Sequence, residues 1–82
     1  MSFAGMAKVI VYSAEWCHFC TKVKDFLKEN NVEYEERNVE NPDYAKESMD
    51  KSKQGGIPVT DIDGQIVVGF NVPKLKELLK LQ

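Results

Sequence analysis

The chain has 82 residues, enough for one domain around a single hydrophobic core but too few for two. Its formal charge of -2, from 11 basic and 13 acidic side chains, gives no large positive field, so we expect no nucleic-acid partner. The longest apolar run, residues 9–12, is far shorter than the roughly 20 residues that cross a bilayer. We therefore expect no membrane span.

Residues 1–7 are predicted to form an irregular N-terminal extension, and residues 8–82 the folded domain. The leader lacks basic residues, an apolar core and a small-residue cleavage pattern, so it does not resemble a secretory signal. The two cysteines lie three positions apart and cannot cross-link distant parts of a secreted fold. A cytoplasmic protein with a chemical use for its cysteine pair is the expectation.

The first half of the domain is predicted to form a strand and then a helix. Residues 8–12 are a β-branched run without helical periodicity, which is typical of a buried strand. From Cys17 to Asn30, apolar side chains recur at spacings of three and four residues, with charged residues between them. The predicted apolar face of this helix comprises Phe19, Cys20, Val23, Phe26 and Leu27.

A weaker strand is predicted over residues 32–40, where Val32, Tyr34 and Val39 lie among charged residues. A second helix is predicted over residues 42–53, because Asn41 supplies an N-cap and is followed by a proline. The apolar face of that helix is thin, and its predicted members are Tyr44, Ala45 and Met49.

The last third is predicted to form a hairpin and a helix. Residues 57–62 and 65–68 are apolar runs joined by Asp63-Gly64, a strong hairpin signal. Residues 72–81 then have apolar side chains on one helical face. The order is strand, helix, strand, helix, strand, strand, helix, in which a right-handed crossover makes the first two strands parallel. The predicted fold class is α/β, a four-stranded mixed sheet with three helices on its faces.

The cysteines lie at the junction between the first strand and the first helix, where open α/β sheets place their chemistry. Cys17 is predicted to occupy the first helical turn. Unpaired backbone N–H groups and the positive end of the helix dipole there stabilise a thiolate, so the thiol pKa is expected to fall. Cys17 is therefore the predicted nucleophile.

A thiolate that attacks a disulfide forms a mixed disulfide with its substrate, and a second thiol is needed to release that substrate. Cys20 lies three residues along the helix, beside Cys17 and turned toward the protein. We therefore predict dithiol exchange in which Cys17 attacks and Cys20 resolves. No cofactor is needed for this chemistry.

Other interpretations of the cysteine pair remain open. The cysteines could be small buried apolar residues. A zinc site needs four ligands, whereas one chain offers two cysteines and His18, so no resident metal is predicted. A functional alternative is an iron-sulfur or metal carrier in which Cys17 ligates a cluster shared by two chains.

Residues around the cysteines are candidates for substrate contact. A histidine carries partial positive charge near neutral pH, so His18 would support the thiolate; a solvent-facing turn residue is the alternative. Trp16 and Phe19 are predicted to form an apolar collar for a protein substrate, although core packing explains Phe19 equally well.

These motifs together resemble the glutaredoxins. The resemblance covers residues 8–81 and rests on Val-Tyr-Ser-x-x-x-Cys-x-x-Cys at 11–20, Gly-Ile-Pro-Val at 56–59, Asp-Gly at 63–64 and Gly-Phe at 69–70. It implies a thioredoxin fold and a cis peptide bond before Pro58, beside the cysteines. It also implies that the backbone of Ile57 pairs with an extended segment of the substrate.

The sequence departs from glutathione-using glutaredoxins at three places. These usually have a lysine three residues before the first cysteine, where this chain has Ala14. They have a basic or amide residue shortly before the proline, where this chain has Gly55. They have Gly-Gly followed by an acid before the last helix, where this chain has residues 69–71. Gly69, Phe70 and Asn71 remain candidates for substrate contact, because the last helix's N-terminus attracts anions.

This pattern resembles a subclass that takes electrons from thioredoxin reductase and passes them to ribonucleotide reductase. The predicted partners are therefore disulfide-bonded proteins, ribonucleotide reductase among them, with thioredoxin reductase as reductant and glutathione as the alternative. A monomer is expected.

Overall fold

A computed structural model describes residues 8–81, and it confirms the predicted order of strands and helices. The predicted extension at residues 1–7 lies outside the described part. No helix within residues 8–81 is long and apolar enough to cross a membrane. The elements are β1 (Val9–Ser13), α1 (His18–Glu29), β2 (Glu35–Asn38), α2 (Pro42–Ser52), β3 (Val59–Ile62), β4 (Gln65–Val68) and α3 (Val72–Leu79).

The four strands form one mixed sheet in the order β2-β1-β3-β4. β1 and β2 are parallel, as the crossover through α1 requires, whereas β3 pairs antiparallel with both β1 and β4. Asp63 and Gly64 connect β3 to β4 with φ angles of 51° and 90°. Positive φ at both central residues is the requirement of the type I′ turn of a two-residue hairpin, so the Asp-Gly prediction is confirmed.

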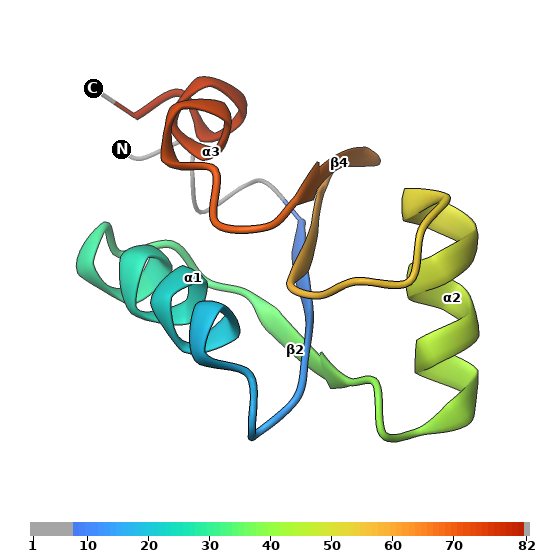
Figure 1. Ribbon diagram of the computed structural model, residues 1–82. Coiled ribbons are helices and arrows are strands. Elements are labelled where there is room, and N and C mark those ends of the chain that lie inside the picture. Colours follow the sequence, from blue (N-terminus) through green and yellow to red (C-terminus); the bar gives the residue numbers. More distant parts are fainter. Residues whose placement is uncertain (1–7, 82) are drawn as a thin grey trace.

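The helices form two layers around the sheet, with α1 and α3 on one face and α2 on the other (Figure 1). The main core lies under α1 and α3. It is built from residues of β1, β3 and β4, from the inner faces of these two helices and from one residue after α1: Val9, Val11, Val23, Leu27, Val32, Ile62, Val67, Leu75 and Leu79. This core fixes α1, and therefore the cysteines at its start, against the end of β1.

β2 is shorter than the predicted strand, because residues 30–32 are used to end α1. Asn31 adopts a left-handed conformation with φ 58°, and the N–H of Val32 donates to the carbonyl of Leu27 at 2.9 Å. The buried side chain of Val32 joins the core from this turn. α3 also ends early, at Leu79, because Lys80 takes a left-handed conformation.

The packing of α2 differs from the predicted apolar face. Met49, assigned to the apolar face, has 53% of its surface exposed, and Ser48 is the buried residue of the helix. A helix with so little apolar surface needs other contacts to stay on the sheet. The structure provides them as a network of hydrogen bonds and ion pairs.

The network is centred on Tyr12, which is fully buried in β1. Its hydroxyl donates to Glu47 and accepts a hydrogen bond from Lys51 Nζ at 2.8 Å, so both partners come from α2. Lys51 also pairs with the buried Asp61 of β3 at 2.7 Å, and Arg37 of β2 pairs with Glu47. Burial, followed by the bond to Glu47, raises the pKa of the Tyr12 phenol.

Replacing Lys51 with methionine tests this attachment. Lys51→Met leaves the carboxylate of Asp61, whose side chain is only 11% exposed, without its counter-charge. We expect the free energy of unfolding at pH 7 to fall by about 2 kcal/mol in urea titrations. Lys46→Met is the matched control, because the Lys46–Asp50 pair on α2 is exposed and should contribute nothing measurable. Equal losses in the two variants would contradict the account.

Candidate active site

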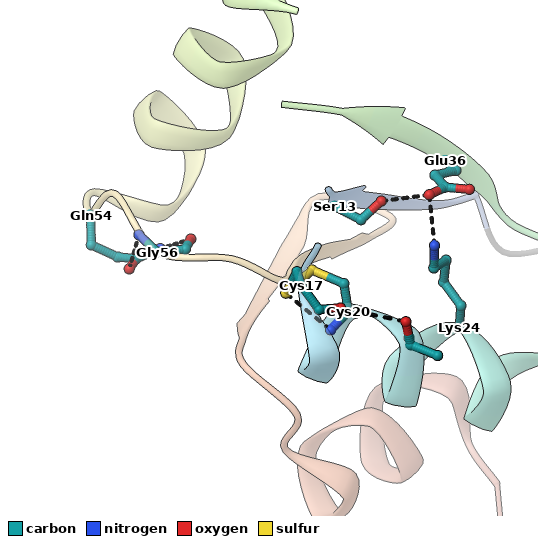
Figure 2. The surroundings of a disulfide bond; sticks show 8 residues. Ser13, Cys17, Cys20, Lys24, Glu36, Gln54 and Gly56 are labelled. Atoms are coloured by element: carbon teal, nitrogen blue, oxygen red, sulfur yellow. Dashed lines mark hydrogen bonds and ion pairs between the residues drawn. A yellow bond between two sulfur atoms is a disulfide. The ribbon is translucent and has the colours of Figure 1, made fainter. Parts of the chain in front are cut away.

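The cysteines lie at the carboxyl end of β1, where the chain turns into α1 (Figure 2). Cys17 is the N-cap of α1 and has extended backbone angles, φ -88° and ψ 112°. Its Sγ accepts a hydrogen bond from the backbone N–H of Cys20 at 3.2 Å. Cys17 therefore lies one position before the predicted first turn. Its sulfur takes the place that a serine or aspartate oxygen fills in an ordinary cap.

Cys17 and Cys20 are joined by a disulfide, with their Cα atoms 5.2 Å apart. Cys20 is completely buried, whereas Cys17 has 8% of its surface exposed. Solvent and substrates therefore reach Cys17 first. This difference matches the order of events expected for an attacking and a resolving cysteine.

The disulfide is packed among apolar side chains from three segments. Ala14, Val39 and Ile57 surround it. Val39 was not among the predicted site residues, although it directly follows β2 and its N–H donates to the carbonyl of Ser13 at 2.9 Å. The carboxyl ends of adjacent parallel strands meet at one edge of a sheet, and this rule would have pointed to Val39.

The Ile57–Pro58 peptide bond is cis, as the resemblance implied, and the side chain of Ile57 packs against the cysteines. The carbonyl of Pro58 accepts a hydrogen bond from the N–H of Gly69 at 2.8 Å, which ties this segment to the end of β4. Within residues 8–81, the N–H and C=O of Ile57 have no hydrogen-bond partner. Both groups are therefore available to an extended peptide.

Three large aromatic side chains are exposed on the segments around the site. Trp16 is 72% exposed, Phe19 55% and Phe70 37%. The core-packing alternative for Phe19 is thus wrong, because the inner face of α1 passes through Cys20, Val23 and Leu27 instead. His18 is also exposed, and its ring meets that of Phe19 edge-on at 5.8 Å between centroids.

Gly69, Phe70 and Asn71 connect β4 to α3. Gly69 has φ 80°, a conformation that favours glycine, and the ring of Phe70 packs edge-on against Phe26 of α1. The side-chain oxygen of Asn71 accepts a hydrogen bond from the N–H of Lys74 at 3.2 Å, so it caps α3. This oxygen already has a partner when a substrate arrives.

A cluster of three polar side chains, which the sequence did not suggest, lies on the α1 side of the disulfide. Ser13 donates to Glu36 at 2.7 Å, and Lys24 pairs with the same carboxylate oxygen at 2.8 Å (Figure 2). The hydrogen bond from Lys24, followed by that from Ser13, holds the pKa of Glu36 below its ordinary value. These bonds join α1 to β1 and β2 next to Cys20.

The arrangement suits thiol chemistry. The amide that points at Cys17 Sγ, together with the positive end of the α1 dipole, stabilises negative charge on that sulfur when the disulfide is reduced. Within residues 8–81, no group of three or more His, Cys, Asp or Glu side chains is arranged to hold a metal ion.

The sequence and the fold were compared with those of known proteins. Residues 9–67 match the family model described as glutaredoxin. A glutaredoxin-like 8.6 kDa protein from the rubredoxin operon of Clostridium pasteurianum is 39% identical over 71 residues, which cover 85% of this chain and 95% of that protein. Glutaredoxin 1 of Rickettsia conorii is 37% identical, with coverage of 99% and 86%.

Solved structures share the fold. The thioredoxin-like protein BC3987 superposes with a TM-score of 0.81 at 38% identity, covering 87% of this chain and 99% of that one. A glutaredoxin from Archaeoglobus fulgidus gives a TM-score of 0.84 at 30% identity, covering 95% and 91%. The predicted four-stranded mixed sheet with three helices is therefore confirmed.

The lowered pKa of Glu36 gives a pH-dependent prediction. Its folded-state pKa lies below the unfolded value of about 4.3. The stability it contributes is therefore present above that pH and is lost as the pH falls through the folded value. Because the side chain is 42% exposed, we expect Glu36→Gln to cost no more than about 1 kcal/mol at pH 7.

Urea midpoints at pH 7 and pH 3 measure this effect. The natural protein should have a higher urea midpoint than Glu36→Gln at pH 7, and the difference between the two midpoints should be smaller at pH 3. Glu29→Gln, on the exposed face of α1, controls for the loss of one negative charge. A gap of the same size at both pH values would contradict the assignment.

Proposed function

The chain belongs to the glutaredoxin family and is a thiol-disulfide oxidoreductase; from this premise we propose that it reduces disulfide bonds in proteins by dithiol exchange. One observation carries the proposal. Cys17 Sγ is at a helix N-terminus with an amide directed at it, and the buried Cys20 is already bonded to it. This arrangement supports Cys17 as the nucleophile and Cys20 as the resolving thiol.

The reaction begins with the reduced protein. The Cys17 thiolate attacks one sulfur of the substrate disulfide; a mixed disulfide forms, and the other substrate sulfur leaves as a thiolate that takes a proton. Cys20 then loses its proton and attacks Cys17 Sγ, which releases the second substrate thiol. Two electrons pass to the substrate, and the protein is left with the Cys17–Cys20 disulfide seen here.

The groups around the cysteines support a protein-sized substrate. The free N–H and C=O of Ile57 offer two hydrogen bonds to an extended segment, which is how a sheet edge accepts a peptide without reading its sequence. Trp16, His18, Phe19 and Phe70 provide exposed ring surface next to the site. Aromatic side chains of this kind are common where proteins meet.

The proposed electron donor is thioredoxin reductase rather than glutathione. Ala14 is 1% exposed and packs on the disulfide, so no cation stands at this place to bind a glutathione carboxylate. Gly55 and Phe70 likewise provide no charged or amide group. We propose that the protein acts as a monomer in the cytoplasm, with ribonucleotide reductase as one candidate substrate.

Two cysteine variants test the order of events. Cys17→Ser should reduce insulin at less than about one hundredth of the natural rate, because no thiolate remains at the helix start. Cys20→Ser should still attack but should accumulate a mixed disulfide, seen as a mass increase that a reducing agent removes. Insulin reduction by Cys17→Ser at the natural rate would contradict the proposal.

The same assay identifies the reductant. NADPH consumption is followed with insulin and either thioredoxin reductase or glutathione with glutathione reductase. We expect sustained turnover only with thioredoxin reductase. Faster turnover with glutathione would reject the proposed donor while leaving the dithiol mechanism intact.

A further inference from the structure

An open pocket with a volume of about 90 Å³ lies between α2 and the segment that leads to Pro58. Most of its wall is apolar, and no charged residue lines it. Its lining residues are Val39, Ala45, Ser48, Met49, Gly55 and Ile57. The dithiol mechanism described above uses the backbone of Ile57 but does not require this cavity.

The pocket is continuous with the apolar surroundings of the disulfide. Val39 and Ile57 line the pocket and also pack against Cys17 and Cys20. In Figure 2 the chain that follows Gly56 runs toward Cys17. A molecule held at the disulfide is therefore close to the pocket mouth.

Two residues of the pocket lining, Gly55 and Met49, are exposed at the surface. A Cβ atom on Gly55 would meet no atom within 4 Å, so the structure leaves room for a side chain at this position. Met49 is 53% exposed and is not needed to hold α2, which the Tyr12 network attaches to the sheet. The flexible thioether of a methionine adapts to apolar groups of different shapes.

We propose that this pocket receives an apolar side chain of the disulfide-bonded protein substrate, one or two residues from its reacting cysteine. The inference rests on the proposed function and adds a preference among substrates. A segment that pairs with Ile57 is extended, and its side chains alternate between its two faces. While the substrate cysteine meets Cys17, a neighbouring side chain points toward the pocket.

The chemistry of the lining selects the occupant. Leucine, isoleucine, methionine and phenylalanine side chains leave water for the surfaces of Val39, Met49 and Ile57. A charged side chain would lose hydration there and would find no opposite charge among the lining residues. The pocket thus favours cysteines that have apolar neighbours in the substrate sequence.

The test uses cysteine peptides joined by a disulfide to 2-mercaptoethanol. Leucine or aspartate is placed in turn at each of the two positions before and after the cysteine. At one of these four positions we expect the leucine peptide to show roughly tenfold higher kcat/KM, as for an apolar group entering a partly open pocket. Gly55→Leu places a bulky side chain at the pocket lining and should abolish this preference.

Gly55→Ala is the matched control. Its methyl group also meets no neighbour and leaves most of the cavity open, so the preference should survive. Reduction of bis(2-hydroxyethyl) disulfide, which has no flanking residue, should be equal in all three proteins. Equal rates for leucine and aspartate peptides at every position would overturn the proposal, as would an unchanged preference in Gly55→Leu.

Binding without chemistry separates this inference from the proposed function. Serine-for-cysteine versions of the peptides are added to the oxidised natural protein, and amide NMR shifts are recorded. The leucine peptide should shift the signals of Val39, Gly55 and Ile57. If the protein binds it but reduces no disulfide, the pocket stands and the proposed reaction fails. If it reduces disulfides without these shifts, the pocket proposal fails alone.

Discussion

The hydrogen bond from the Cys20 amide to the Cys17 sulfur is the interaction on which the rest of the site depends. It exists because Cys17 caps α1, so that an unpaired N–H of the first turn points at sulfur instead of water. The core under α1 and α3 holds that helix against β1. The fold thus holds the start of α1, with its two cysteines, at the carboxyl end of β1.

α2 is attached to the sheet mainly by polar contacts. It has few apolar side chains, and it stays on the sheet through Tyr12, Glu47, Lys51 and Asp61, which satisfy one another in a partly buried network. Because polar bonds hold this helix, Met49 stays free at the surface beside Gly55. The open pocket near the disulfide lies beside this helix.

Much of this was predictable from the sequence, for identifiable reasons. The spacing of apolar residues gave α1 and α3, and Asp63-Gly64 gave the hairpin, because these signals are local. The polar network was not predictable, since it joins residues up to 39 positions apart that show no pattern along the chain. Phe19 was ambiguous because it borders the apolar stripe of α1, and only the sheet's position decides which edge is covered.

The pKa of the Cys17 thiol in the reduced protein tests the central claim most directly. Thiolate absorbance near 240 nm, followed against pH and compared with Cys17→Ser, isolates this group. A helix-capping sulfur with a directed amide should titrate below the free cysteine value of about 8.5, within roughly 3.5–7.5. A value at or above that of free cysteine would contradict the account, because the helix end would then provide no stabilisation of the thiolate.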